Sequence, residues 1–478
     1  MSGTWLGLDL GTSSLKGLLV DDEGRVLGRG RSCYPTRRAG VRVEQDAHSW
    51  HGPLRDVVAQ CCRDRRPDGV ALVGHTPSLV LADPHREAVE PVLSWQDTRA
   101  ADEARELADR CGAPDDAVGT HLPWGPSYLP AKLLWIARHR PAGLHRTRWL
   151  LQPKDYLAYL LTGEAATDLW SSKGLCRVDD GTAVAEVFAA AGVDPKLLPP
   201  RRDPWQAMGV VDAEGADRTG LRIGTPVAVG WSDALAGMLA LGVFQQPRAF
   251  VLTGTSDIAG ISHRGIDGPC DAAGAADNAA ANTGEAVLHI PATCAPLPVR
   301  YGPTQASGAS LVWLAHILGR EPNDVAQMSG HAQLEAVPRF LPYLDGERAP
   351  IWRPEARGIL QGLSLATGSA ELARAVMRGV ALSGRHVIET AMRGDGLPEV
   401  HLGGAAAATP EWVQVRLEGF RHTGTPAPRT RDGCPGRLRT RRERRNRPAG
   451  HRGFRPVHRG GCDPNAGAER HRHQRKIV

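Results

Sequence analysis

Short apolar runs that fit β-strands recur along the first third of the chain. "WLGLDLG" (residues 5–11) is an apolar run that ends in glycine, and "LKGLLVDDEGRVLGRGRS" (15–32) then alternates around an Asp-Glu-Gly turn. Alternation of this kind, interrupted by a turn, predicts a β-hairpin. Two further strands are predicted within residues 70–83, where apolar runs flank a polar tip at residues 75–78.

Other segments have helical spacing. "SYLPAKLLWIARHRP" (127–141) predicts a helix that stops at proline, and residues 369–391 have the clearest amphipathic pattern in the chain. Residues 225–243 predict a strand, a turn at Ser232 and Asp233, and then a helix rich in glycine and alanine. Residues 400–412 predict strand, glycine turn and helix. Because strands and helices alternate, the predicted fold class is α/β.

Two hairpins far apart in the sequence share one design. "GLDLGTSSLKGLLV" and "AFVLTGTSDIAGI" each consist of a strand, a Gly-Thr-Ser turn and a second strand. Proteins built from two related halves have repeats of this kind, so we expect two lobes that each present a hydroxyl-rich turn.

The charge of the chain is unevenly distributed. The 478 residues are 41% hydrophobic and 23% charged, which is typical of a globular protein with two or three domains. Residues 421–478 contain 17 Lys+Arg against 4 Asp+Glu, including the run "RLRTRRERRNRP" at 437–448. The remaining residues contain 41 basic and 48 acidic side chains, a balance of −7. The acidic body therefore predicts no nucleic-acid partner.

The cysteines and the apolar segments indicate in which cellular compartment the protein is expected. Nine cysteines are scattered without a CxxC pair, so neither a disulfide framework nor a zinc site is expected. The N-terminus lacks the basic start and apolar core of a signal peptide. The most apolar later window, residues 234–244, is too short to span a bilayer. We expect a cytoplasmic protein without a membrane partner.

The first Gly-Thr-Ser turn is a candidate phosphate loop. Glycine allows close approach of a ligand to the backbone, and N–H groups with hydroxyls can hold phosphate oxygens. A lysine adds a positive charge, and an aspartate at a strand end can hold Mg²⁺ through water. The residues concerned are Asp9, Gly11, Thr12, Ser13 and Lys16. The alternative is a hairpin turn with polar side chains and no ligand, and the residues alone leave both readings open.

The second turn repeats the pattern with Gly254, Thr255 and Ser256. A single turn of this type is uninformative, because serine and threonine are common in turns. Two such turns at the heads of matching hairpins are more telling, because a nucleotide polyphosphate held between two lobes needs one from each.

Asp233 is the candidate general base. It lies between a predicted strand and a predicted helix, where a carboxylate could accept a hydroxyl proton during phosphoryl transfer. Position alone favours a different role, the helix N-cap, which aspartate often fills.

Several further polar or glycine-rich positions could bind ligands. Gly403, Gly404 and Ala405 form a turn that could lie against an adenine or ribose, and Gln305 and Gly308 belong to a similar segment. Each could instead be a tight connection. The polar cluster in "SWQDTR" and the tip after residue 74 are candidate polyol contacts, although a solvated loop and a satisfied core histidine are the simpler readings. These candidates are Trp95, Asp97, Arg99, His75 and Thr76.

The order of these segments resembles the FGGY family of carbohydrate kinases, the xylulokinases in particular, from Trp5 to about Trp412. The matching segments are "GLDLGTSSLKGLLVDDEG", "VEQDAHSW", "SWQDTR", "AKLLWIARH", "PKDYLAYLLTGEAATD", "GTPVAVGWSDALAG", "LTGTS", "FLPYLDGERAPIWRPEARGILQGL", "ELARAVMRGVAL" and "LGGAAAATPEW". The resemblance implies a two-lobed fold of the actin, hexokinase and Hsp70 (ribonuclease H-like) type, with ATP and sugar in the cleft between lobes. The implied domains are residues 1–245, 246–420 and a tail, 421–478.

The resemblance also implies roles for the candidates. It makes Asp233 the catalytic base and Asp9 the residue that organises Mg²⁺, with the two turns as phosphate loops and the glycine turn after residue 402 as the adenosine site. The expected reaction is transfer of a phosphoryl group from ATP to a sugar or polyol, with D-xylulose as the leading substrate. Ribulose, gluconate or a tetritol are alternatives, as is a non-catalytic sugar- or nucleotide-binding protein, and a homodimer is left open.

The chain departs from the family pattern in two places. Xylulokinases usually have Gln-Met-His-Gly where residues 75–78 read His-Thr-Pro-Ser, and Ala234 replaces an asparagine that often follows the base. After residue 420 the family's apolar periodicity disappears and arginine dominates. Of the 58 Lys+Arg only six are lysine, which is typical of GC-rich coding. We therefore expect residues 421–478 to be disordered and to be translated from a shifted reading frame, with the frameshift near residues 415–425. We expect this chain to have impaired activity as a result.

Overall fold

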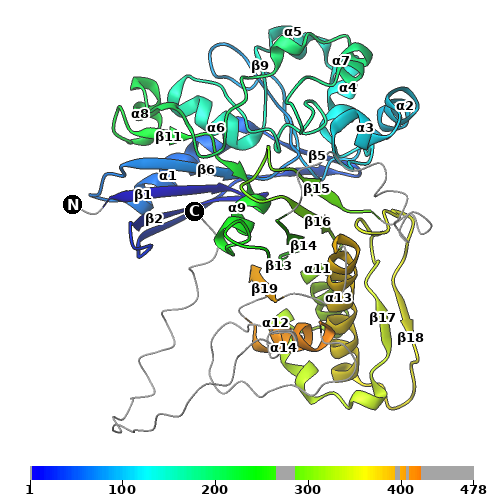
Figure 1. Ribbon diagram of the computed structural model, residues 1–478. Helices are drawn as coiled ribbons and strands as arrows, with labels where there is room; N and C mark the ends of the chain where they lie inside the picture. The colour runs from blue at the N-terminus through cyan, green and yellow to red at the C-terminus, as the bar shows by residue number, and fades with distance from the viewer. Residues whose placement is uncertain (1–2, 265–285, 393–398, 405–408, 421–478) are drawn as a thin grey trace, which may run out of the picture. The chain divides into compact units, whose positions relative to one another are not determined.

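The chain forms two compact units. The computed structural model describes residues 3–264, 286–392, 399–404 and 409–420 (Figure 1). The first unit contains residues 3–240 and Leu288–Val299, and the second contains the other described residues. Ala405 and the predicted tail, 421–478, lie outside the described residues. Within those residues no helix is both long and apolar enough to cross a membrane.

The first unit is built on a mixed β-sheet with the order β10-β11-β6-β1-β2-β3, and β12 also pairs with β6. The predicted hairpin is present as an antiparallel meander of β1, β2 and β3, while β6, β11 and β12 add parallel neighbours. The strands are β1 (Thr4–Leu10), β2 (Ser14–Asp21), β3 (Val26–Cys33), β6 (Gly69–Gly74), β10 (Ala207–Val210), β11 (Pro226–Ala228) and β12 (Trp231–Ser232).

The other strands and the helices of this unit lie outside that sheet. The strands are β4 (Arg37–Ala39), β5 (Arg42–Gln45), β7 (Val80–Ala82), β8 (Val92–Leu93), β9 (Trp149–Leu151) and β15 (Leu288–Ile290). The helices are α1 (His51–Cys62), α2 (Ala101–Cys111), α3 (Pro114–Val118), α4 (Leu129–His139), α5 (Pro141–Arg146), α6 (Pro153–Thr162), α7 (Ala185–Ala191), α8 (Ala213–Thr219) and α9 (Asp233–Ala240).

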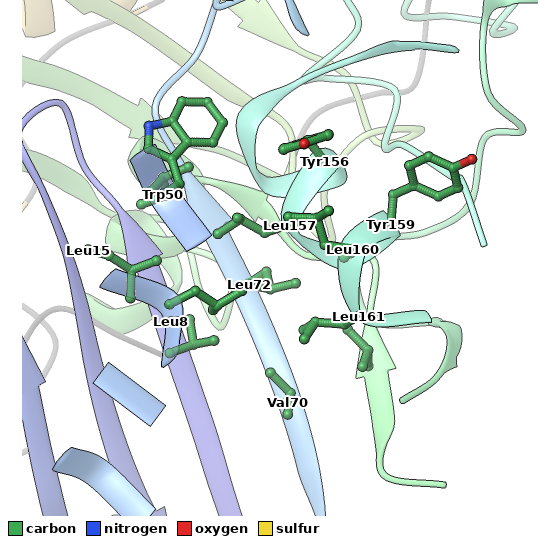
Figure 2. Close-up of a cluster of buried hydrophobic side chains, with 14 of the residues drawn as sticks. Leu8, Leu15, Trp50, Val70, Leu72, Tyr156, Leu157, Tyr159, Leu160 and Leu161 are labelled. Carbon is green, nitrogen blue, oxygen red and sulfur yellow. The ribbon is translucent and has the colours of Figure 1, made fainter. Parts of the chain in front are cut away.

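The core of the first unit lies between the sheet and its helices. Figure 2 shows Leu8, Val70 and Leu72 of the sheet opposite Leu157 and Leu161 of α6. These side chains are at most 3% exposed, so their burial stabilises β1 and β6 against α6. The core thus fixes where those strand ends lie.

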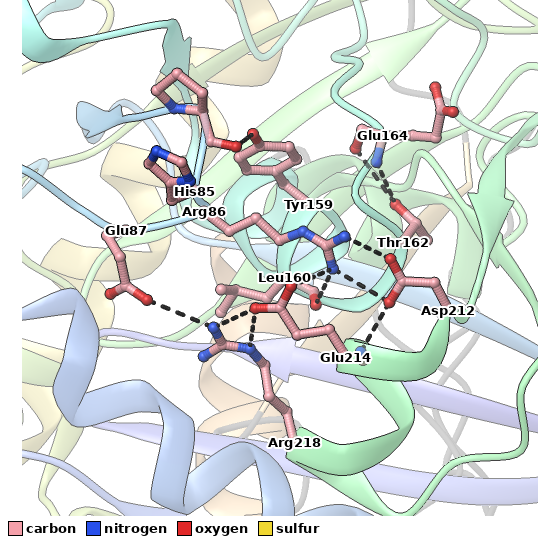
Figure 3. A network of polar contacts seen from close by, with 12 residues as sticks. His85, Arg86, Glu87, Tyr159, Leu160, Thr162, Glu164, Asp212, Glu214 and Arg218 are labelled. Carbon is pink, nitrogen blue, oxygen red and sulfur yellow. Dashed lines mark hydrogen bonds and ion pairs between the residues drawn. The ribbon is translucent and has the colours of Figure 1, made fainter.

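A network of ion pairs fastens α8 to the rest of the unit (Figure 3). Arg86 pairs with Asp212, the N-cap residue of α8, and also lies 3.6 Å from Glu214. Arg218 pairs with Glu214 at 2.6 Å and with Glu87 at 3.4 Å. None of these side chains is among the predicted site residues, and their contacts join α8 to Arg86 and Glu87.

The second unit repeats the hairpin design. Its sheet has the neighbours β16-β14-β13-β19, in which β13 is antiparallel to β14 and parallel to β19. The predicted helix over residues 369–391 is confirmed as α13. The elements are β13 (Ala249–Thr253), β14 (Asp257–Ser262), β16 (Val299–Pro303), β17 (Arg339–Leu341), β18 (Ile359–Gln361), β19 (Val400–Gly404), α11 (Gly308–Leu318), α12 (Pro322–Met328), α13 (Ser369–Ala391) and α14 (Pro410–Gly419).

Candidate active site

Three parallel strands of the first unit end at one edge of its sheet. The register places Asp9 beside Val73, and it places both Leu10 and Ser232 beside Gly74. The residues that follow these strand ends are therefore neighbours. They are the first Gly-Thr-Ser turn after β1, His75 after β6 and Asp233 after β12. The carboxyl edge of parallel strands is where open α/β sheets commonly bind ligands.

The first turn is held by its carbonyl groups. The Tyr34 hydroxyl donates to the Gly11 carbonyl, and the Tyr34 N–H donates to the Ser13 carbonyl at 3.2 Å. The Thr12 carbonyl accepts from Gln45 Nε2 at 2.7 Å and from Thr36 Oγ1 at 3.1 Å.

Some N–H groups of the same turn, unlike its carbonyls, are available to a ligand. The N–H groups of Thr12 and Ser13 have no partner among the described residues. With its carbonyls occupied and its N–H groups available, the turn is suited to an anion such as phosphate.

Asp9 provides a carboxylate beside this turn. Its side chain is 9% exposed, and Lys16 Nζ lies 3.5 Å from Asp9 Oδ2. Asp9 Oδ1 is buried and has no hydrogen-bond partner in the described part of the chain. A buried carboxylate oxygen of this kind fits a Mg²⁺ that keeps several waters and is also held by substrate phosphates. No cluster of three or more His, Cys, Asp or Glu among the described residues offers another metal site.

Asp233 is exposed and opens α9. Asp233 Oδ1 accepts from the N–H of Ala234 at 2.7 Å, whereas Ser232 Oγ accepts from the N–H of Leu235 at 3.5 Å. A side-chain bond from the N–H of the third helical residue is typical of an N-cap, and here Ser232, not Asp233, accepts it. A carboxylate at a helix N-terminus is stabilised by the helix dipole.

The buried Lys173 interacts electrostatically with Asp233. Lys173 donates to the Trp170 carbonyl at 3.1 Å. Burial lowers the pKa of Lys173 to about 8, while the carboxylates of Asp168 and Asp233 act in the opposite direction.

The 94–99 segment contacts both the loop after β6, through the Trp95 N–H and Ser78 Oγ, and the first turn. The His75 N–H donates to the Leu10 carbonyl at 3.1 Å. Trp95 Nε1 donates to Thr12 Oγ1 at 3.0 Å, so this predicted substrate residue is joined to the predicted phosphate loop. Thr76 is half-buried beside His75.

Asp97 and Arg99 form a buried ion pair. Arg99 Nη2 lies 2.6 Å from Asp97 Oδ2, and the two side chains are 3% and 1% exposed. Asp97 Oδ2 also accepts from the Val43 N–H at 2.6 Å, and Arg99 pairs with Glu44 at 2.7 Å. The structure therefore gives both side chains protein partners that stabilise the loop, and their contact with substrate stays a prediction.

The second turn is held in the same way as the first. The Gly254 carbonyl accepts from the Gly308 N–H at 3.1 Å, and the Thr255 carbonyl accepts from the N–H groups of Ser307 and Ala309. The N–H groups of Thr255 and Ser256 have no partner among the described residues. This turn is therefore also suited to an anion.

The predicted adenosine turn lies beside the second turn. In the parallel pair of β13 and β19, Gly403 is opposite Leu252 and Gly404 is opposite Thr253. Gly404 has φ +89°, and a Cβ atom there would lie 2.1 Å from the Thr253 carbonyl oxygen, so only glycine fits. The backbone N–H of Gln305 donates to Glu347 Oε1 at 2.5 Å, which fixes the position of this residue.

A buried ion pair beneath the second turn was not predicted. Arg416 Nη2 lies 2.6 Å from Asp257 Oδ2 and donates to Ser307 Oγ at 3.1 Å. Both side chains are at most 2% exposed, and burial raises the pKa of Asp257 although Arg416 opposes that change. The pair joins α14 to the hairpin that carries the turn. An arginine within the apolar part of a helix was the only sequence signal for it.

Comparisons with known proteins identify the family. Residues 4–240 match the N-terminal domain of the FGGY family of carbohydrate kinases, and residues 250–418 match its C-terminal domain. The chain is 30% identical to the xylulose kinase of Streptomyces rubiginosus and 31% identical to that of Streptomyces coelicolor. Each match covers 87% of this chain and 82% of the relative.

Solved structures agree with this assignment. A crystal structure titled as a xyloylose kinase from Brucella ovis is 26% identical, with a TM-score of 0.75 over 87% of this chain and 85% of that one. A gluconate kinase from Lactobacillus acidophilus, 21% identical, has the same TM-score over 88% and 85%, and shows the fold alone. These matches confirm the predicted α/β fold of the actin and hexokinase type. The chain belongs to the FGGY family of carbohydrate kinases and is a carbohydrate kinase.

Proposed function

We propose that the chain transfers the γ-phosphoryl group of ATP to a hydroxyl of a ketopentose, with D-xylulose as the first candidate. The observation that carries this proposal is the shared edge of β1, β6 and β12, which brings Asp9, the first turn and Asp233 together. The xylulose kinases to which the chain is about 30% identical support the choice of sugar.

Asp233 is the residue that we assign as general base. It is exposed at the N-terminus of α9, so its carboxylate can accept the proton of the attacking hydroxyl. In-line phosphoryl transfer otherwise requires mainly positioning and charge neutralisation.

The two Gly-Thr-Ser turns are the residues that we assign to the phosphates. Their free N–H groups donate to phosphate oxygens, and Lys16 adds a positive charge. Asp9 would hold Mg²⁺ through its unpartnered Oδ1. Mg²⁺, when bound, neutralises charge on the transferred phosphoryl group. The turn at Gly403 and Gly404 is assigned to the adenosine.

Residues 75–78 and Ala234, which depart from the family pattern, are the reason to test several substrates. Pro77 and Ala234 stand where the family usually has a histidine and an asparagine, and a site that has lost such polar contacts discriminates polyols differently. Ribulose, gluconate and a tetritol are therefore the alternative acceptors.

The test is release of ADP, measured in a coupled assay with the full chain, ATP, Mg²⁺ and a panel of these acceptors. We expect the highest kcat/KM with D-xylulose. Turnover of a gluconate or a tetritol with no turnover of any ketopentose would replace the proposed substrate. No turnover of any acceptor, either by the full chain or by the chain with the frame after residue 420 corrected, would overturn the proposed function.

A further inference from the structure

His75 is enclosed by polar and aromatic groups that determine its hydrogen bonding. Its side chain is 2% exposed, and the ring of Trp50 packs against it at 85° with 6.4 Å between the ring centroids. His75 Nδ1 lies 2.8 Å from Ser78 Oγ. His75 Nε2 is buried and has no partner among the described residues.

The Ser78 hydroxyl determines which ring nitrogen carries the proton. Ser78 Oγ accepts from the Trp95 N–H at 2.9 Å, and Ser78 is fully buried. In the described part of the chain His75 Nδ1 is the acceptor within reach of the Ser78 hydroxyl proton. A buried hydroxyl donates where it can. The arrangement therefore favours Ser78 donating to Nδ1, which leaves the proton of the neutral imidazole on Nε2.

Lys132 holds the two loops around this histidine. It is fully buried in α4, and its Nζ donates to the Pro77 carbonyl at 2.8 Å and to the Ser94 carbonyl at 2.7 Å. Pro77 precedes Ser78, and Ser94 precedes Trp95. The side chain of Lys132 therefore holds in place both Ser78 and Trp95, which are joined by the bond from the Trp95 N–H to Ser78 Oγ. Loss of that group would separate the loops.

The charge of Lys132 has a second effect on His75. Burial and the nearby ammonium together lower the pKa of His75 to about 3. Burial lowers the pKa of Lys132 itself to about 7, while the nearby charge of Asp97 raises it and that of Arg99 lowers it. The imidazole is therefore neutral at any pH where an enzyme assay is done.

We propose that Ser78 and Lys132 are positioning residues that hold His75 with its Nε2–H as a hydrogen-bond donor for an oxygen atom of the sugar or polyol. A buried donor without an acceptor costs free energy, and a substrate oxygen would remove that cost. This inference rests on the proposed function, because it concerns the acceptor substrate of the same reaction.

The first test is the tautomer of His75. The full chain is labelled with ¹⁵N-histidine, and the His75 signals are assigned by their loss in His75→Gln. We expect the Nε2–H tautomer in the native chain, unchanged down to pH 5.5. We expect Ser78→Ala to lose this preference. An Nδ1–H tautomer in the native chain, or an unchanged tautomer in Ser78→Ala, would overturn the positioning role.

The second test separates the two substrates kinetically. Ser78→Ala and Lys132→Met should lower kcat/KM for the sugar roughly five- to one-hundredfold, the effect expected for one lost hydrogen bond to a buried group, with little change in the KM for ATP. His75→Gln keeps an amide donor and should retain more activity than His75→Ala. Thr219→Val, which removes a buried hydroxyl in α8 that donates to Gly215, is the matched control and should behave as the native chain.

The outcomes distinguish this inference from the proposed function. If the native chain phosphorylates sugars and folded Ser78→Ala has the native KM for the sugar, the inference is overturned and the proposed function stands. If neither the native chain nor the chain with the frame after residue 420 corrected phosphorylates any acceptor, the proposed function and the donor role toward substrate are both overturned. The ¹⁵N spectra still decide whether Ser78 fixes the tautomer.

Discussion

The N–H of Gly308 donates to the carbonyl of Gly254 at 3.1 Å, and this contact places the start of α11 directly against the second Gly-Thr-Ser turn. The approach is close because Gly308 has no side chain. A Cβ atom at Gly308 would lie 2.5 Å from the Gly254 carbonyl oxygen.

Gly308→Ala should therefore displace the second turn. We expect a rise in the KM for ATP of about tenfold or more, since positioning of phosphate donors is lost, and a smaller change in the KM for the sugar. The control is Gly330→Ala in the same unit, where a Cβ atom would meet nothing within 4 Å. Equal kinetics for the two variants would mean that the second turn does not bind phosphate.

Lys16→Met tests the first turn. Lys16 lies beside the first turn, with its Nζ 3.5 Å from Asp9 Oδ2. Our proposal assigns the positive charge of Lys16 to the phosphates. Loss of that charge should therefore lower kcat/KM for ATP by a factor on the order of 10². Lys196→Met is the control, because the Lys196 side chain is 89% exposed. An effect confined to the KM for the sugar would show that the first phosphate loop is misplaced.

The ion pair of Asp257 and Arg416 should stabilise the fold of the second unit. Removal of one partner leaves a buried charge unpaired, so we expect Arg416→Met to lower the free energy of unfolding by about 3–5 kcal/mol. The double variant Asp257→Asn, Arg416→Met should lose less than the single variant. Urea unfolding measures both, and losses that simply add would contradict the coupling.

The stability of the chain should depend on pH through His75. Its pKa is lowered to about 3 in the folded chain, against about 6.5 when unfolded. As the pH falls through 6.5 the unfolded chain takes up this proton first, so the free energy of unfolding decreases between pH 6.5 and 3. His75→Gln lacks this contribution, so between pH 8 and pH 5 the native chain should lose up to about 2 kcal/mol more free energy of unfolding than the variant. Parallel curves for both chains would contradict a buried neutral His75.

The sequence predicted the elements that depend on local pattern. The amphipathic helix 369–391 and both Gly-Thr-Ser hairpins are present as predicted, because periodicity and turn residues determine them. The segment 225–243 was predicted less well. The structure divides its strand into β11 and β12, and Ser232 belongs to β12 while Asp233 begins α9.

Side-chain partners were harder to predict, because they come from residues far apart in the chain. Asp97 and Arg99 remain candidates for substrate binding, but the sequence did not predict that they pair with each other, with Glu44 and with the Val43 N–H. Lys132 was not singled out although it is a lysine within an apolar helix pattern. Only the tertiary structure shows that it lies under two loops.

The central claim is that Asp233 is the base of a sugar kinase. The measurement that tests it most directly compares the native chain with Asp233→Asn for ADP release with D-xylulose, together with ATP binding by calorimetry. We predict a fall in kcat of about 10²- to 10⁴-fold with ATP binding unchanged. An Asp233→Asn chain that phosphorylates D-xylulose at the native rate would contradict the account.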